Sequence, residues 1–276
     1  MLDAYQLASS RLWLLEPMWL ETILQIAARE NDIHALQTKL GKPLDHTHTV
    51  RMIDGVAVVP VTGPIFRYAN LFTAISGATS TQVLATDIRA AIDNPYVRGV
   101  VLDIDSPGGE ATGINELAAM IRQASAIKPV VAYAGGAMAS AAYWLGSAAS
   151  EVVADATAIV GSIGVVATYL DTTKRDEKSD VRRVEIVSSV SPDKRVDPNS
   201  DDGRAKLQAT VDALADVFVN AVAKFRAVKP EVVRTDFGRG GVMVGAAAKA
   251  AGMVDRIGSL DSVIAELAGR LRATSS

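Results

Sequence analysis

The stretch VRGVVLDIDSPGG (97–109) joins a run of β-branched and other apolar residues to a glycine turn. An apolar run of this length that ends in turn residues is typical of a buried strand. Serine, proline and two glycines follow it, and these residues favour tight turns. The stretch therefore predicts a buried strand that leads directly into a turn, and the segments around it indicate which sheet the strand joins.

Strands and helices alternate on both sides of this stretch. The patterns predict strands at 56–65, 128–136, within 151–166 and at 181–189, and helices at 80–94, 111–126, 139–149 and 201–227. This alternation predicts an α/β fold with a mostly parallel sheet and crossover helices. Sites in such sheets gather where the carboxyl ends of strands meet the amino ends of helices. The glycine turns at 108–109 and 135–136 both lie at that kind of junction.

The chain divides into three parts. Residues 1–45 are expected to be a helical extension, because apolar residues repeat at helical spacing within it, and it is a candidate for contacts between copies of the chain. A turn-rich linker, GKPLDHTHT (41–49), leads into a main domain at 46–270. Residues 271–276 are expected to be a frayed tail.

Composition excludes several classes of function. Of the 276 residues, 49% are hydrophobic and 21% charged, which suits a folded domain, and the net charge of −3 offers no basic surface for nucleic acid. The absence of cysteine removes disulfides, thiolate metal sites and cysteine nucleophiles. His46 and His48 could share a metal ion, but a solvated linker is the preferred interpretation, so we expect neither a metal nor a cofactor.

The sequence does not predict a membrane span. No stretch approaches the roughly 20 uninterrupted apolar residues that a span needs, and the amino terminus lacks the pattern of a secretory signal. The apolar segment LWLLEPMWLETILQIAA (12–28) is instead expected to pack on a neighbouring chain. A cytoplasmic location follows as an expectation.

Ser140 is the first candidate for chemistry. It lies among small residues in AGGAMASAAYWLGSAAS (134–150), after a double glycine and at the start of a predicted helix. A serine there is either a helix cap or a nucleophile, in which case the N–H of Ala141 points the same way as its hydroxyl. Gly108 and Gly109 form either a simple tight turn or, with that N–H, an oxyanion hole.

A nucleophilic serine needs a base, and all three histidines precede the first core strand. Lysine can serve when burial lowers its pKa. Lys194 lies between the predicted strand 181–189 and the long helix, and composition alone ranks it only slightly above the other lysines, namely Lys128, Lys174, Lys178, Lys206 and Lys224.

Four segments, in this order, resemble the signal peptide peptidase A family of serine proteases, and in particular its phage branch, the capsid assembly (head maturation) proteases. They are VAVVPVTGPI (56–65), DIDSPGG (103–109), MASAAYWLGSAASEVVADATAIVGSIGVV (138–166) and FGRGGVMVGAAAKAAGMVDRIGSLDSVI (237–264). The resemblance covers roughly residues 50–270 and implies a fold of the ClpP/crotonase superfamily.

The resemblance also implies roles for individual residues. Ser140 falls on the nucleophile, Lys194 on the general base, and Ser162 on a serine that orients the lysine. Gly109, beside Gly108, falls on the oxyanion hole together with the N–H of Ala141. The family usually has glycines after its nucleophile (A-S-G-G-Y), whereas Ala141 and Ala142 stand here. The segment around Lys194 is the least similar of those that matter.

Partners are also implied by the resemblance. The family assembles into rings in which neighbours can complete each other's sites, so we expect a homo-oligomer. The expected substrate is a polypeptide, either a capsid scaffold or portal protein or the chain itself, in the host cytoplasm or the prohead.

Three alternatives stay open. One is a bacterial signal-peptide peptidase. Another is a crotonase-type acyl-CoA enzyme, for which the candidate carboxylates are Glu110 and Glu116, after the first glycine turn. The third is a non-catalytic assembly protein, against which the presence of Ser140 and Lys194 argues.

Overall fold

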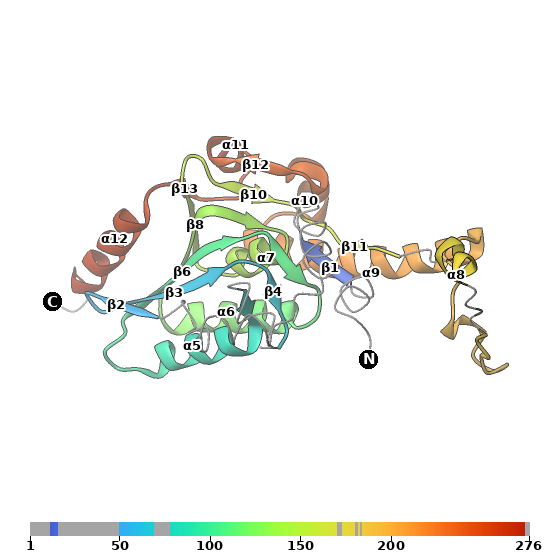
Figure 1. Cartoon of the computed structure of the whole chain (residues 1–276). Coiled ribbons are helices and arrows are strands. Elements are labelled where there is room, and N and C mark those ends of the chain that lie inside the picture. The colour runs from blue at the N-terminus through green and yellow to red at the C-terminus, as the bar shows by residue number, and fades with distance from the viewer. Residues whose placement is uncertain are drawn as a thin grey trace.

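The computed structural model describes residues 12–15, 50–68, 78–169, 173–179, 182 and 184–273, and its elements are labelled in Figure 1. The strands are β1 (Leu12–Leu15), β2 (Arg51–Ile53), β3 (Val56–Thr62), β4 (Ile65–Phe66), β5 (Thr79–Ser80), β6 (Gly99–Ser106), β7 (Gly108–Glu110), β8 (Val130–Ala139), β9 (Glu151–Ala154), β10 (Ile159–Gly161), β11 (Val166–Ala167), β12 (Val242–Val244) and β13 (Arg256–Ile257). The helices are α5 (Thr81–Asp93), α6 (Ile114–Ile127), α7 (Ala141–Ser147), α8 (Thr173–Lys178), α9 (Asp201–Arg226), α10 (Pro230–Asp236), α11 (Gly245–Ala250) and α12 (Leu260–Ala273), with short 3₁₀ turns η1 (Pro192–Lys194) and η2 (Gly238–Gly240).

An eight-stranded sheet forms the centre of the molecule. Its main path runs β12-β10-β8-β6-β3-β2, and β9 pairs with both β8 and β13. The pairs β3/β6, β6/β8, β8/β9, β8/β10 and β9/β13 are parallel, whereas β2 and β12 add antiparallel strands at the two ends. Helices connect the successive parallel strands. The predicted α/β class, with a mostly parallel sheet and crossover helices, is confirmed.

Helices cover both faces of this sheet. Side chains alternate along β6, so that Val100 and Leu102 join the larger core with α5, α6, α7 and α9, while Val101 joins a smaller core with α12. Figure 1 shows α5 and α6 along one side of the sheet and α12 on its own at one end. Each large apolar side chain buried in these cores contributes about 1.5–3 kcal/mol.

Helix α9 extends beyond the sheet. Its second half is anchored, because Phe218, Val219, Val222 and Ala223 are buried, whereas in its first half only Gly203 is. Figure 1 shows this first half projecting away from the sheet, with α8 at its outer end.

A second, five-stranded sheet has the order β11-β1-β7-β4-β5. It begins where the main sheet is interrupted at Pro107, because β6 ends at Ser106 and β7 starts at Gly108 with a φ of 101°. The sequence predicted a buried strand that leads into a glycine turn over 97–109; the strand is β6, and the glycines of the expected turn begin a second strand, β7, in the other sheet.

Three further predictions need correction. Residues 12–15, which lie in the expected helical extension, form the strand β1, because they pair with β7 and β11; the rest of 1–45 lies outside the described residues. Residues 184–190 form no strand, since no neighbouring strand pairs with them there, and Ile186 is 94% exposed. The expected tail is in part helical, because α12 continues to Ala273.

Candidate active site

Ser140 lies at the junction between β8 and α7. Its N–H donates to the Gly161 carbonyl at 2.6 Å, and its own carbonyl accepts from the Trp144 N–H at 3.0 Å. These two bonds hold Ser140 at φ 53° and ψ −117°, a conformation that side-chain-bearing residues rarely adopt. Such strain persists only where the surrounding structure enforces it, and it concentrates at functional sites.

The Ser140 hydroxyl is buried without a hydrogen-bond partner among the described residues, and the residue is 1% exposed. A buried polar group in that state is costly and therefore uncommon in a folded protein. Ser147, in the same helix, is equally buried but donates from Oγ to the Trp144 carbonyl at 2.8 Å. The Ser147 hydroxyl therefore has a structural role, whereas the Ser140 hydroxyl is reserved, in the sense that it is buried and makes no hydrogen bond with the described residues. The helix-cap interpretation of Ser140 finds no support, because its side chain makes no capping bond.

The glycine turn lies against Ser140. A Cβ added at Gly108 would lie 2.9 Å from the Ser140 Cβ, and one at Gly109 would lie 1.9 Å from the Ile65 carbonyl oxygen. Both positions therefore need glycine for lack of space. The Gly108 N–H donates to Ser106 Oγ at 3.2 Å. The Gly108 N–H is therefore engaged, and Gly109 lies in β7, opposite Leu14 of β1 and Ile65 of β4.

Ser162 lies beside Ser140. The parallel pairing of β8 with β10 places Gly161 opposite Ala139, so the residues that follow the two strands, Ser162 and Ser140, lie next to each other at the same edge of the sheet. Ser162 is also buried and has a positive φ of 54°, and its N–H donates to the Gly241 carbonyl at 2.7 Å. The structure thus brings both predicted serines to one edge of the sheet.

Asp105 supports the double glycine before the nucleophile, a role that the sequence did not reveal. The pairing of β6 with β8 shifts between Ile104 and Ser106, and the Asp105 carboxylate accepts the Ala137 N–H at 2.9 Å inside that irregularity. A Cβ at Gly136 would lie 2.4 Å from the same carboxylate oxygen. The irregularity thus lies between Ala134 and Met138 of β8, just before Ser140.

Helix α7 is fixed by its aromatic residues. Trp144 stacks on Phe218 of α9 with ring centroids 4.5 Å apart. The Tyr143 hydroxyl donates to the Met253 carbonyl at 3.0 Å. Complete burial raises the pKa of the Tyr143 phenol above its ordinary value, which keeps that donor protonated.

Lys194 is not brought to Ser140 within the chain. It is the last residue of η1, is exposed, and lines a hollow of about 800 Å³ with Tyr169, Glu185 and residues of α9. Figure 1 shows the segment between α8 and α9 beyond the outer end of α9, far from α7. A lysine base has to be desolvated, and this exposed position does not provide that.

The other lysines that the sequence left open are engaged or exposed. Lys128 Nζ donates to the Ala91 and Asn94 carbonyls, and Lys206 Nζ contacts Asp193 and Asp202. Lys174, Lys178 and Lys224 are exposed.

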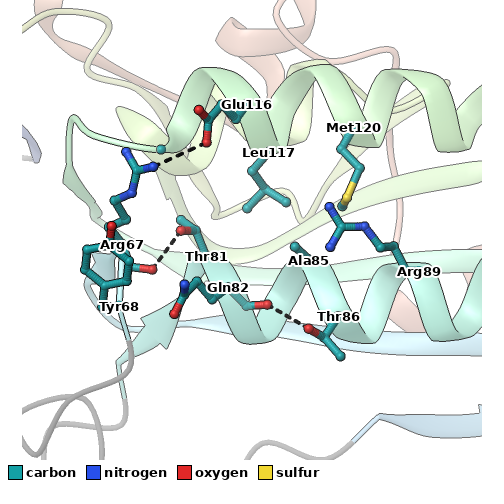
Figure 2. A pocket seen from close by; sticks show the side chains of 11 residues that line it. Arg67, Tyr68, Thr81, Gln82, Ala85, Thr86, Arg89, Glu116, Leu117 and Met120 are labelled. Atoms are coloured by element: carbon teal, nitrogen blue, oxygen red, sulfur yellow. Dashed lines mark hydrogen bonds and ion pairs between the residues drawn. The ribbon is translucent and has the colours of Figure 1, made fainter.

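A separate cavity of about 370 Å³ lies between α5 and α6 (Figure 2). Arg67 and Glu116 close one end of it with an ion pair of 3.6 Å, and Thr81 Oγ1 donates to the Arg67 carbonyl at 3.0 Å. Ser140 does not line this cavity. Glu110 is held by the Arg67 N–H and by Thr112 Oγ1, so both carboxylates of the acyl-CoA alternative make structural contacts.

Comparison with known protein families identifies the family to which the chain belongs. The family model described as peptidase family S49 matches residues 122–274, more than half of the chain. The chain belongs to peptidase family S49. That match contains Ser140, Ser162 and Lys194 but not the turn at 108–109.

Individual S49 relatives cover more of the chain. The chain is 33% identical over 188 residues to "Capsid assembly protease C" of Escherichia phage lambda. The aligned residues make up 66% of the chain and 42% of that relative. The chain is 30% identical over 228 residues to "Head-tail preconnector protein GP5" of Enterobacteria phage P21, which covers 81% of the chain and 44% of that relative. A "Putative signal peptide peptidase SppA" of Enterococcus faecium is 27% identical, over 71% of the chain and 57% of that relative. The chain thus spans less than half the length of the two phage relatives.

Within the described part of the chain, no helix has both the length and the apolar character needed to span a bilayer. The same residues contain no group of three or more side chains suited to hold a metal ion.

Proposed function

We propose that this S49 protein is a serine endopeptidase with Ser140 as its nucleophile and Lys194 as its general base. The observation that carries the proposal is the buried, strained Ser140 with its unpartnered hydroxyl at the start of α7. Ala141 follows Ser140 and begins α7, so its N–H has no acceptor within the helix. The turn of Gly109 lies beside Ser140. The nearby Ser162 supports a role in orienting the lysine.

The proposed reaction is acyl transfer. The neutral Lys194 amine takes the proton from Ser140 Oγ while Oγ bonds to the peptide carbonyl carbon, and the N–H groups of Gly109 and Ala141 hold the oxyanion. The C–N bond then breaks as the lysine returns its proton to the leaving amine. A water molecule, deprotonated by the same lysine, attacks the acyl carbon, and Ser140 leaves as the free hydroxyl.

The exposed position of Lys194 leads us to propose that the dyad is completed between copies of the chain. Lys194 of one copy would enter the site of a neighbour, where contact with that copy would exclude water from the amine. The exposed segment 184–200 and the projecting half of α9 are suited to such a reach, because neither packs into the core of its own copy. This proposal agrees with the ring assembly that the family resemblance implies.

The proposed substrates are polypeptides of the phage head, such as scaffold or portal proteins, since two relatives carry names from capsid assembly and head–tail connection. A signal-peptide peptidase is the alternative, to which the name of the Enterococcus relative points. Purified prohead components and synthetic signal peptides, offered side by side, separate the two by which set is cleaved.

A mixing experiment tests the dyad. Ser140→Ala and Lys194→Ala should each reduce hydrolysis of fluorescently labelled casein at least about a thousandfold. When the two variants are unfolded, mixed in equal amounts and refolded, random assembly should restore about a quarter of the wild-type sites if neighbours supply the lysine.

Two matched controls accompany the mixing experiment. Ser147→Ala removes a buried hydroxyl of the same helix, and Lys224→Ala removes an exposed amine of α9; both should keep wild-type activity. An inactive mixture contradicts completion between copies. An active Lys194→Ala variant shows that another group is the base, and an inactive wild type rejects the peptidase.

A further inference from the structure

The strand β1 lies between the two elements that flank the candidate site. On one edge it runs antiparallel to β7, with Leu14 opposite Gly109 and Leu15 opposite Gly108. On its other edge it runs antiparallel to β11, which begins four residues after Ser162. A segment from the start of the chain thus fills the gap between the predicted oxyanion turn and the strand after Ser162, and Figure 1 shows β1 next to β11.

β1 also contacts the nucleophile's surroundings. A Cβ placed on Gly108 would lie 2.2 Å from the Leu14 carbonyl oxygen and 2.9 Å from the Ser140 Cβ. The Leu14 backbone and the Ser140 side chain therefore meet against the same face of one glycine. Leu14 is 1% exposed and belongs to the larger core, so its side chain fills a closed apolar position.

This is the arrangement that a bound polypeptide would adopt. Exposed strand edges take up extended peptides by adding a strand, with main-chain pairing giving affinity and alternate side chains giving specificity. A peptidase has to hold a substrate backbone extended beside its nucleophile. β1 meets both requirements. Two strand edges pair with it, and the Leu14 carbonyl oxygen lies against the same glycine, Gly108, as the Ser140 Cβ.

We propose that the gap between β7 and β11 is the polypeptide-binding site of this protein, and that β1 occupies it as an intramolecular substrate mimic. The free chain is then self-inhibited, and a substrate displaces β1, runs antiparallel to β7 and places an apolar side chain in the position of Leu14. The inhibitory consequence rests on the proposed peptidase function. The position of β1 in the gap does not.

Engineered disulfides test where β1 lies. The chain has no cysteine, so the pairs Trp13→Cys/Val166→Cys and Leu12→Cys/Ala167→Cys can each be introduced without a competing thiol. Residues directly opposite each other in an antiparallel pair have Cβ atoms about 4.5–5.5 Å apart, near the range that a disulfide bridges, and one of two adjacent pairs has the closer geometry. We expect at least one pair to form the bond in the full-length protein on mild oxidation.

The oxidised protein should hydrolyse labelled casein at least about tenfold more slowly than the reduced one, because a tethered competitor acts at a high effective concentration. Dithiothreitol should restore the rate. Each single-cysteine variant serves as a control and should not respond to oxidant. A cross-linked protein that keeps its full activity overturns the proposal.

Leu14→Asp in the full-length chain gives an independent measurement. A carboxylate at this buried apolar position should expel β1, so that KM for a fluorogenic peptide falls several-fold while kcat stays unchanged. Leu14→Met keeps the apolar contact and should leave KM at the wild-type value. An unchanged or higher KM in a folded Leu14→Asp protein contradicts the proposal, and the disulfides decide the question if that variant does not fold.

Mass spectrometry of the cross-link separates the two possible failures, because it needs no activity. A cross-link in a protein that cleaves nothing even after dithiothreitol has reduced it supports the position of β1 and rejects the peptidase. Absence of both cross-links in a chain that cleaves casein supports the peptidase and overturns the position of β1.

Discussion

The junction of β8 with α7 and the segment 184–200 carry the two proposed members of one catalytic pair, yet they differ in almost every physical property. All side chains of α7 are buried, and Trp144 and Tyr143 fix the helix to α9 and to the Met253 carbonyl. In 184–200 no residue is fully buried, Ile186 is 94% exposed, and Lys194 is exposed at the end of η1.

The nucleophile and its proposed base are therefore positioned by different parts of the structure. The core of a single chain suffices to strain Ser140 and to leave its hydroxyl unpartnered among the described residues. Among the described residues, no comparable packing positions Lys194. Substitutions near α7 should therefore affect folding, whereas substitutions in 184–200 should affect only activity.

The largest effect is expected for Phe218→Ala. This fully buried ring stacks on Trp144, so its loss leaves a cavity beside α7 and should lower the free energy of unfolding by about 3–5 kcal/mol. Urea denaturation followed by circular dichroism measures the change. Val217→Ala, the half-exposed neighbour on the same helix, is the control and should cost less than about 1 kcal/mol. Equal losses in both variants would show that α9 does not anchor α7.

A smaller effect is expected for Asp255→Asn. Asp255 accepts bonds from Arg226 at 2.7 Å and from the Val152 N–H at 2.7 Å, and so joins the anchored end of α9 to β9. Burial acts to raise the pKa of Asp255, but these two donors outweigh it, and the pKa lies below its ordinary value. Because the carboxylate is partly exposed, we expect a loss of about 1 kcal/mol at pH 7.

The pH dependence gives the sign of this effect. A carboxyl group whose pKa is lower in the folded state stabilises the fold fully above its unfolded pKa of about 3.9, and the contribution disappears as the pH falls through the folded pKa. The difference in free energy of unfolding between wild type and Asp255→Asn should therefore be complete at pH 6 and smaller at pH 3. The exposed Asp236, changed to asparagine, is the control. A difference that stays constant with pH would contradict an ionised Asp255 as the stabilising group.

The smallest effect on stability is expected in the segment that carries the lysine. Lys194→Ala and Ile186→Asp should each change the free energy of unfolding by less than about 0.5 kcal/mol, since neither side chain is buried. The same urea titration measures this, beside the casein assay that should find Lys194→Ala inactive. A stability loss above about 1 kcal/mol would show that the segment packs on its own chain.

Local pattern was sufficient to predict much of this molecule. The buried run at 97–109, the alternation of strands and helices, and the small residues around Ser140 gave the α/β class and the junctions at which Ser140 and the turn of Gly109 lie, whereas Ser162 was singled out only by the family resemblance. These features depend on neighbours in sequence: periodicity, helix starts and glycine turns. The proximity of Ser140 and Ser162 comes from the parallel pairing of β8 with β10 in the structure.

Only the tertiary structure decided which segments find a partner. VEIVSSV (184–190) has the composition of a strand but pairs with no strand of the described residues, whereas LWLL (12–15) lies in a helical pattern and becomes a strand, because β7 and β11 offer it two edges. The support of Gly136 by Asp105 and the position of Lys194 in a hollow with Tyr169 and residues of α9 likewise depend on contacts between segments far apart in the chain. The sequence indicated the α/β class, most of the helices and core strands, and Ser140 as a candidate. Long-range pairing and burial, which no local pattern contains, decided whether 12–15 and 184–190 form strands and left the Ser140 hydroxyl without a partner among the described residues.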